Sequence, residues 1–131
     1  MPSRTVTVTI ERPPAIVVDF ARDPGNLPRW ATAFCRSVRK TPDGWVVETP
    51  DGDAGFRFVE TDAAGVLDHV VTLADGTVVV VPMRVVATGK GSEVALTVVL
   101  PEGVTDHAFE ADVAMVVADL GRLRAALEGM G

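Results

Sequence analysis

The sequence TDHAFEADVAMVVADLGRLRAALEG, residues 105–129, decides the fold. Read as a helix, this stretch spaces its large apolar residues alternately four and three positions apart, which places them in one stripe. The stripe consists of Phe109, Val113, Val116, Leu120, Leu123 and Leu127. No other long segment has this period, and the residues before it alternate as strands do. The sequence therefore predicts one long helix lying across a sheet.

The chain before this helix predicts strands and short helices. Strand 5–10 alternates threonine with valine and isoleucine, so that one of its faces is buried. Two short helices are expected at 15–22 and 26–33, the first started by Pro14. Further strands, separated by turns rich in Gly, Pro and Asp, are expected at 34–40, 45–49, 54–60, 66–73, 77–87 and 92–100. We predict an α+β fold in which a sheet of about seven antiparallel strands twists and curves around the long helix.

Composition indicates a single domain over residues 1–131 that builds an apolar core easily. The mean hydropathy of +0.27 is high for a chain of this size. It favours either an apolar cavity or a surface patch that oligomerises. The net charge is −6 and the pI is near 4.8, so neither nucleic acid nor an anionic membrane surface is an expected partner.

Several motifs are missing, and their absence narrows the function class. Cys35 is the single cysteine, so an intrachain disulfide is excluded, and its aromatic neighbours predict a buried, inert thiol. The longest apolar run, 78–83, is too short for membrane insertion, and the N-terminus lacks a signal peptide, so we expect a cytoplasmic protein. No phosphate-binding glycine loop, serine elbow or metal-ligand spacing occurs, so no cofactor and no metal are predicted.

Short motifs along the whole chain point to a known superfamily. They are VTVTI at 6–10 leading into RPP at 12–14, DPGNLPRW at 23–30, LDHVV at 67–71 and PMRVV at 82–86. Together with the order of elements, they resemble the START-like (SRPBCC) superfamily of helix-grip proteins, especially bacterial proteins called polyketide cyclase/dehydrase-like. The resemblance implies a deep pocket between the sheet and the long helix, usually for a hydrophobic or aromatic small molecule.

Alternation along the strands predicts which side chains reach that pocket. The predicted ligand-binding residues are Trp30, Phe34, Phe56, Phe58, Leu67, His69, Val71, Val81, Met83, Leu96, Phe109, Val113 and Val116. Trp30 could equally be a core plug that closes one end of the sheet. Strand 77–87 is ambiguous because both faces are apolar. The face with Val81 and Met83 avoids burying Arg84, which would otherwise need a carboxylate such as Glu60 or Asp68.

His69 is the one candidate catalytic residue. Alternation points it inward, in mid-strand, where a histidine can serve as acid or base near neutral pH. The alternative is a core histidine whose ring is satisfied by a neighbouring polar group.

Three functions remain open: a carrier or sensor of a small apolar or aromatic ligand, a cyclase- or dehydratase-like enzyme using His69, and an interaction subunit whose cavity is filled by its own side chains. The long helix also has a second periodic face, which makes a homodimer one of the possible partners. It carries Ala111, Ala114, Ala118, Gly121 and Ala125. This face reflects either helix propensity or close approach of a second copy of the chain.

Overall fold

A computed structural model describes residues 3–100 and 103–130. The predicted domain 1–131 also includes residues 1, 2, 101, 102 and 131, which lie outside the described part. The elements in chain order are β1 (Ser3–Ile10), α1 (Pro14–Ala21), the 3-10 helix η1 (Pro24–Asn26), α2 (Leu27–Trp30), β2 (Ser37–Thr41), β3 (Gly44–Thr49), β4 (Gly52–Phe58), β5 (His69–Thr72), β6 (Val78–Val81), β7 (Met83–Thr88), β8 (Gly91–Val99) and α3 (Asp106–Glu128). This order confirms the predicted α+β class.

The strands form two antiparallel sheets, ordered β1-β8-β7 and β2-β3-β4-β5-β6, where the sequence predicted one sheet of about seven strands. The division falls at Pro82, between the end of β6 and the start of β7. Proline has no N–H to donate to a ladder, so the predicted strand 77–87 is interrupted there. The Thr97 N–H donates to the Pro82 carbonyl oxygen at 2.9 Å, which keeps β8 attached to the junction.

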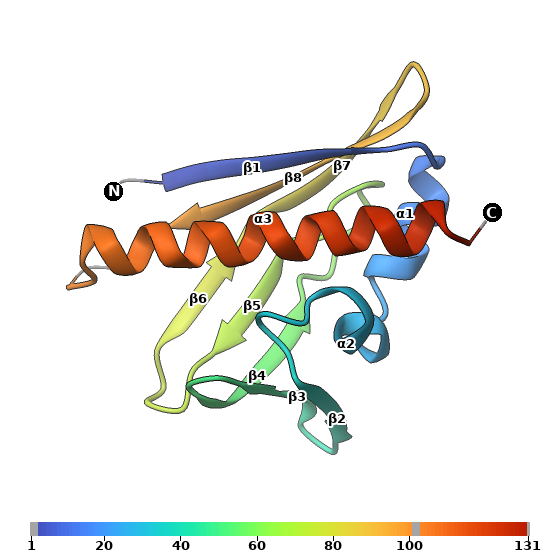
Figure 1. Ribbon diagram of the computed structural model, residues 1–131. Coiled ribbons are helices and arrows are strands. Elements are labelled where there is room, and N and C mark those ends of the chain that lie inside the picture. The colour runs from blue at the N-terminus through green and yellow to red at the C-terminus, as the bar shows by residue number, and fades with distance from the viewer. Residues whose placement is uncertain (1–2, 101–102, 131) are drawn as a thin grey trace.

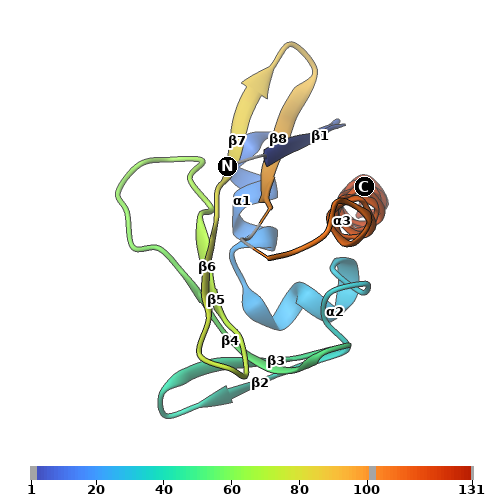
Figure 2. The same cartoon turned by 90° about the vertical axis from the view of Figure 1, so that its left-hand side faces the viewer.

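Helix α3 lies across both sheets (Figure 1). Viewed after a 90° turn, α3 is seen nearly end-on, with β5 and β6 opposite it and α2 beside it on the concave side (Figure 2). The predicted packing of a long helix against a curved antiparallel β layer is therefore observed, with the layer formed by two sheets in place of one.

Helix α3 begins at a side-chain cap and packs through its apolar stripe. The Thr105 hydroxyl accepts the Ala108 N–H at 3.1 Å, which satisfies one of the free N–H groups of the first turn. Within the stripe, Leu120, Leu123 and Leu127 are fully buried. The small-residue face, from Ala111 to Ala125, is exposed. None of the helices in the described residues is long and apolar enough to cross a membrane.

The structure settles which face of segment 77–87 is inside. Met83 and Val85 are buried, whereas Val80 and Val86 are more than half exposed. Arg84 points outward and pairs with Asp68, whose carboxylate also accepts the Met83 N–H at 2.8 Å. Burying the face with Val81 and Met83 avoids the desolvation of a guanidinium group.

Candidate functional site

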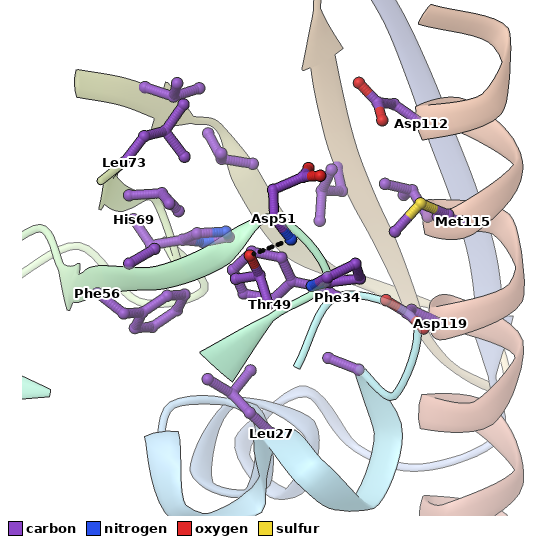
Figure 3. Close-up of a pocket in the computed structure, with 18 of the residues that line it drawn as sticks. Leu27, Phe34, Thr49, Asp51, Phe56, His69, Leu73, Asp112, Met115 and Asp119 are labelled. Carbon is purple, nitrogen blue, oxygen red and sulfur yellow. Dashed lines mark hydrogen bonds between the residues drawn. The ribbon is translucent and has the colours of Figure 1, made fainter. Parts of the chain in front are cut away.

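A cavity of about 850 Å³ lies between α3, α2 and the inner faces of β4, β5 and β6. The turn joining β3 to β4 (residues 49–52) and the turn joining β5 to β6 contribute to its edge. The volume falls within the range of sites that enclose small organic ligands. Figure 3 shows side chains from the strands, the turns and α3 converging on this space.

Ten of the thirteen predicted ligand-binding residues line the cavity: Trp30, Phe34, Phe56, Phe58, His69, Val71, Val81, Met83, Leu96 and Val116. The other three, Leu67, Phe109 and Val113, are buried in the core without lining it. Leu67 lies before β5 begins, and its N–H donates to the Met83 carbonyl oxygen at 2.8 Å. Phe109 is covered by the Arg4 guanidinium of β1, whose central carbon lies 5.7 Å from the ring centroid.

The wall supplied by α3 differs from the expected one. The cavity is lined by Ala108, Asp112, Met115 and Asp119, which form a stripe adjacent to the apolar stripe. The apolar stripe, from Phe109 to Leu127, mostly packs into the core, with Val116 and Leu120 shared between the core and the cavity. Of the α3 residues predicted to line the cavity, only Val116 does so, and the helix also turns the carboxylates of Asp112 and Asp119 toward the cavity. The four-three-four spacing of the second stripe is visible in the sequence and could have identified it.

Aromatic rings form one wall of the cavity. Phe56 stacks on the His69 imidazole, with ring centroids 5.0 Å apart and 28° between the planes. Phe58 meets Phe56 edge-on at 5.2 Å, and Phe34 lies 6.4 Å from Phe56. The register of β4 against β5, which pairs Phe58 with His69, sets these contacts. Such a wall suits the flat face of an aromatic or apolar ligand.

The hydrogen bonds of His69 define the protonation of its ring. The residue is only 9% exposed, and its Nδ1 lies 3.0 Å from the Leu67 carbonyl oxygen. A carbonyl can only accept, so Nδ1 carries the proton and Nε2 is an acceptor. Burial lowers the pKa of His69, an effect partly opposed by the bond to Leu67, so the ring is neutral at pH 7. The ring extends over Phe56 into the cavity (Figure 3).

Five aspartates line the cavity: Asp51, Asp53, Asp75, Asp112 and Asp119. Three of them are already bonded. Asp53 pairs with Arg39 at 2.9 Å, Asp75 accepts the Thr77 N–H, and the buried Asp119 accepts from Ala33 N–H and Arg122. Among the described residues, the carboxylates of Asp51 and Asp112 have no hydrogen-bond or ion-pair partner, and no lysine or arginine lines the cavity.

The negative charge of Asp51 acts on the carboxylate of Asp112. Burial raises the pKa of Asp112, and the negative charge of Asp51 raises it further. Asp51 lies on the turn between β3 and β4, and Asp112 lies on α3, so the pair spans the cavity from sheet to helix (Figure 3). Neither residue is predicted as part of the site from the sequence, because nothing local links positions so far apart.

Trp30 and Cys35 are both buried near the cavity. Trp30 lines it, and the buried indole N–H has no acceptor in the described part of the chain. Burial raises the pKa of Cys35 to about 11, with smaller contributions from the charges of Asp119 and Glu48. Its thiol donates to the Ser37 carbonyl oxygen at 3.3 Å, in agreement with an inert cysteine. No three His, Cys or carboxylate groups within residues 3–100 and 103–130 converge as metal ligands do.

The pH dependence of stability is expected to report on His69. Its lowered pKa means that the unfolded chain binds its proton first as pH falls below about 6.5. The contribution of the neutral His69 to the free energy of unfolding is therefore fully present above that pH and is lost as the pH falls toward the pKa of His69 in the folded state. We expect H69Q to lose less stability than the wild type between pH 7.5 and 5.5, measured by urea unfolding at each pH. Parallel losses in both proteins would contradict a neutral, buried His69.

Proteins of known structure share this fold. No protein-family model and no curated protein matches the sequence. XoxI from Bacillus cereus is 19% identical, covers 97% of this chain and 96% of its own, and has a TM-score of 0.76. An AHSA1-like protein from Aeromonas hydrophila is 20% identical with a TM-score of 0.67, covering 97% of this chain and 96% of its own. DynU16, from the dynemicin biosynthetic locus, is 18% identical with a TM-score of 0.74 and covers 96% of this chain, which spans 47% of that protein. At these identities the likeness shows the fold alone.

Proposed function

We propose that this protein binds a small hydrophobic or aromatic molecule in the cavity, as a carrier or sensor of the START-like (SRPBCC) type. The observation that carries the proposal is the cavity of about 850 Å³ with its wall of Phe34, Phe56, Phe58 and His69. Sites for small ligands combine such apolar walls with a few placed polar groups. The unfilled space weighs against an interaction subunit whose own side chains occupy the cavity. DynU16, whose name places it in a biosynthetic locus, offers support by analogy of fold.

Native mass spectrometry of the purified protein and thermal unfolding with apolar and aromatic compounds test this proposal. A ligand that binds only the folded state stabilises it by about 2.7 kcal/mol at a free concentration of about 100 times Kd. We expect aromatic compounds of two or three rings to raise Tm. The absence of any bound molecule and of any Tm shift across the compound classes would overturn the proposal.

Two neighbouring valines of α3 provide a matched pair of variants. Val116 lines the cavity, whereas Val117 is 53% exposed. We expect V116W to place an indole in the space that the ligand would occupy. The ligand then loses contacts with the cavity wall, and its binding should weaken at least about tenfold. V117W adds the same side chain on the solvent side and should bind as the wild type does. Equal affinities in both variants, measured by calorimetric titration, would place the ligand elsewhere.

A second candidate function is acid–base catalysis by His69 on a bound substrate, as in a cyclase or dehydratase. The specific observation in favour is the bond from Nδ1 to the Leu67 carbonyl, which leaves Nε2 as a base in a neutral ring. Such a base would accept a proton from a phenol or an activated carbon acid lying against Phe56. H69Q should then abolish turnover of a substrate that the variant still binds. Unchanged turnover in H69Q would remove the enzyme hypothesis and leave the binding proposal intact.

A further inference from the structure

We propose that the ligand is an amine that is protonated at neutral pH. Its aromatic or apolar body lies against the aromatic wall that contains Phe56, and its ammonium group lies between Asp51 and Asp112. This inference rests on the proposed binding function and names the chemical class of its ligand. It follows from the polar atoms that the cavity leaves without partners.

The accessible side-chain polar atoms that lack partners in the described cavity are acceptors. His69 is buried, and because Nδ1 donates to the Leu67 carbonyl, its Nε2 can only accept. The carboxylates of Asp51 and Asp112 line the cavity without a donor. Trp30 carries the one unpaired donor among these described lining side chains, and its Nε1 is itself buried. A ligand that satisfies this set must bring hydrogen-bond donors, and an ammonium group brings three of them.

The charges around the cavity select the same class of ligand. The described lining residues include five aspartates and no lysine or arginine, and only Asp53 and Asp119 are neutralised, by Arg39 and Arg122. Asp51 and Asp112 face one another across the space without a cationic side chain of the described chain between them. Two like charges in this arrangement repel one another. Besides burial, the negative charge of Asp51 raises the pKa of Asp112, as such repulsion does. A cation placed between the two carboxylates would relieve it, whereas a fatty acid or another anion would add to it.

The apolar part of the ligand follows from where the rings lie. Phe34 lies on the segment after α2, and Phe56 and Phe58 lie on β4. Phe56 lies on the strand side of the space, across from Asp112 and Met115 of α3 (Figure 3). The turn that carries Asp51 and the stripe that carries Asp112 meet the cavity from other sides. The ligand is therefore expected to have an apolar end and a charged end. The Phe56 wall adds ring faces that tolerate a nearby cation.

Three probes of matched shape test the inference: 1-naphthylmethylamine, 1-naphthylmethanol and 1-naphthoate, titrated at pH 7 and low ionic strength. We expect the amine to bind at least about tenfold more tightly than the alcohol, and the carboxylate more weakly than both. Raising the salt concentration should narrow these differences, because the two carboxylates are only partly shielded from water.

The double variant D51N/D112N keeps the shape of the site and removes the charges of its two carboxylates that have no partner among the described residues. The double variant should bind the amine about tenfold more weakly than the wild type does, so that most of the preference for the amine over the alcohol is lost. It should bind the alcohol within about twofold of the wild-type affinity. D43N is the control, because Asp43 lies on the turn between β2 and β3 and does not line the cavity. D43N should keep the wild-type order of affinities.

The outcomes separate this inference from the proposed function. If the alcohol and the amine bind equally and D51N/D112N changes neither, the binding function stands and the amine inference is overturned. Preference for the carboxylate would also overturn it. If none of the three probes binds and no larger aromatic compound shifts Tm, the binding function itself fails.

Discussion

Replacing Phe56 with alanine is expected to lower the free energy of unfolding by about 3–5 kcal/mol, a large fraction of the total stability of a single domain. Phe56 is 4% exposed and stands at the centre of the aromatic wall, in contact with Phe34, Phe58 and His69. Removing the ring leaves a void that opens into the cavity and strips the His69 imidazole of its stacking partner. Urea unfolding monitored by circular dichroism would measure the loss.

Phe58 provides the matched control for this prediction. It lies two residues further along β4 on the same face, but its ring is only half buried and borders the cavity. F58A should therefore cost about 1–2 kcal/mol, since less apolar surface returns to water and less new void forms. Both variants should weaken binding of an aromatic ligand. A loss in F56A no larger than that in F58A would mean that the aromatic wall does not support the fold.

Replacing Asp119 with alanine is expected to cost about 3 kcal/mol. Asp119 is 5% exposed, and its Oδ1 accepts the Ala33 N–H at 3.0 Å and an Arg122 N–H at 2.5 Å. Arg122 also donates to the Trp30 carbonyl oxygen, so this cluster ties α3 to the segment that follows α2. The alanine variant leaves a backbone donor unsatisfied and a guanidinium unpaired. The cost is below that of a fully buried pair because the Arg122 side chain is 40% exposed.

Two further substitutions separate the hydrogen bond from the charge. D119N keeps an oxygen for the Ala33 N–H and should recover about half of the loss in D119A. D112A removes a carboxylate from the same helix stripe, seven residues earlier, where it has no partner among the described residues, and should change stability by less than about 0.5 kcal/mol. Similar losses in D119A and D112A, measured by urea unfolding, would show that the charge of α3 matters and that the hydrogen bonds of Asp119 do not.

Sequence periodicity alone determined the architecture and the direction of most strand side chains. The stripe from Phe109 to Leu127 predicted α3, and alternation pointed Phe56, Phe58 and His69 inward. These patterns are readable because side chains repeat every 3.6 residues on a helix and every two on a strand, whatever the rest of the chain does. The interruption at Pro82 also had a local cause, the missing N–H, although the division into two sheets did not follow from it alone.

Only the tertiary structure decided which stripe of α3 faces the cavity and which charges meet there. Periodicity defines a buried stripe but does not say whether the residues beside that stripe touch the core or an empty space. The sequence therefore predicts Phe109 and Val113 in the cavity, whereas the structure places Asp112 there and buries Phe109 and Val113 in the core. Asp51 and Asp112 come together because the turn between β3 and β4 reaches the same space as α3. That approach depends on sheet curvature and helix position, which arise from packing across the whole chain. The acidic side of the cavity, on which the proposed class of ligand rests, therefore depends on the tertiary structure and cannot be read from any local sequence pattern.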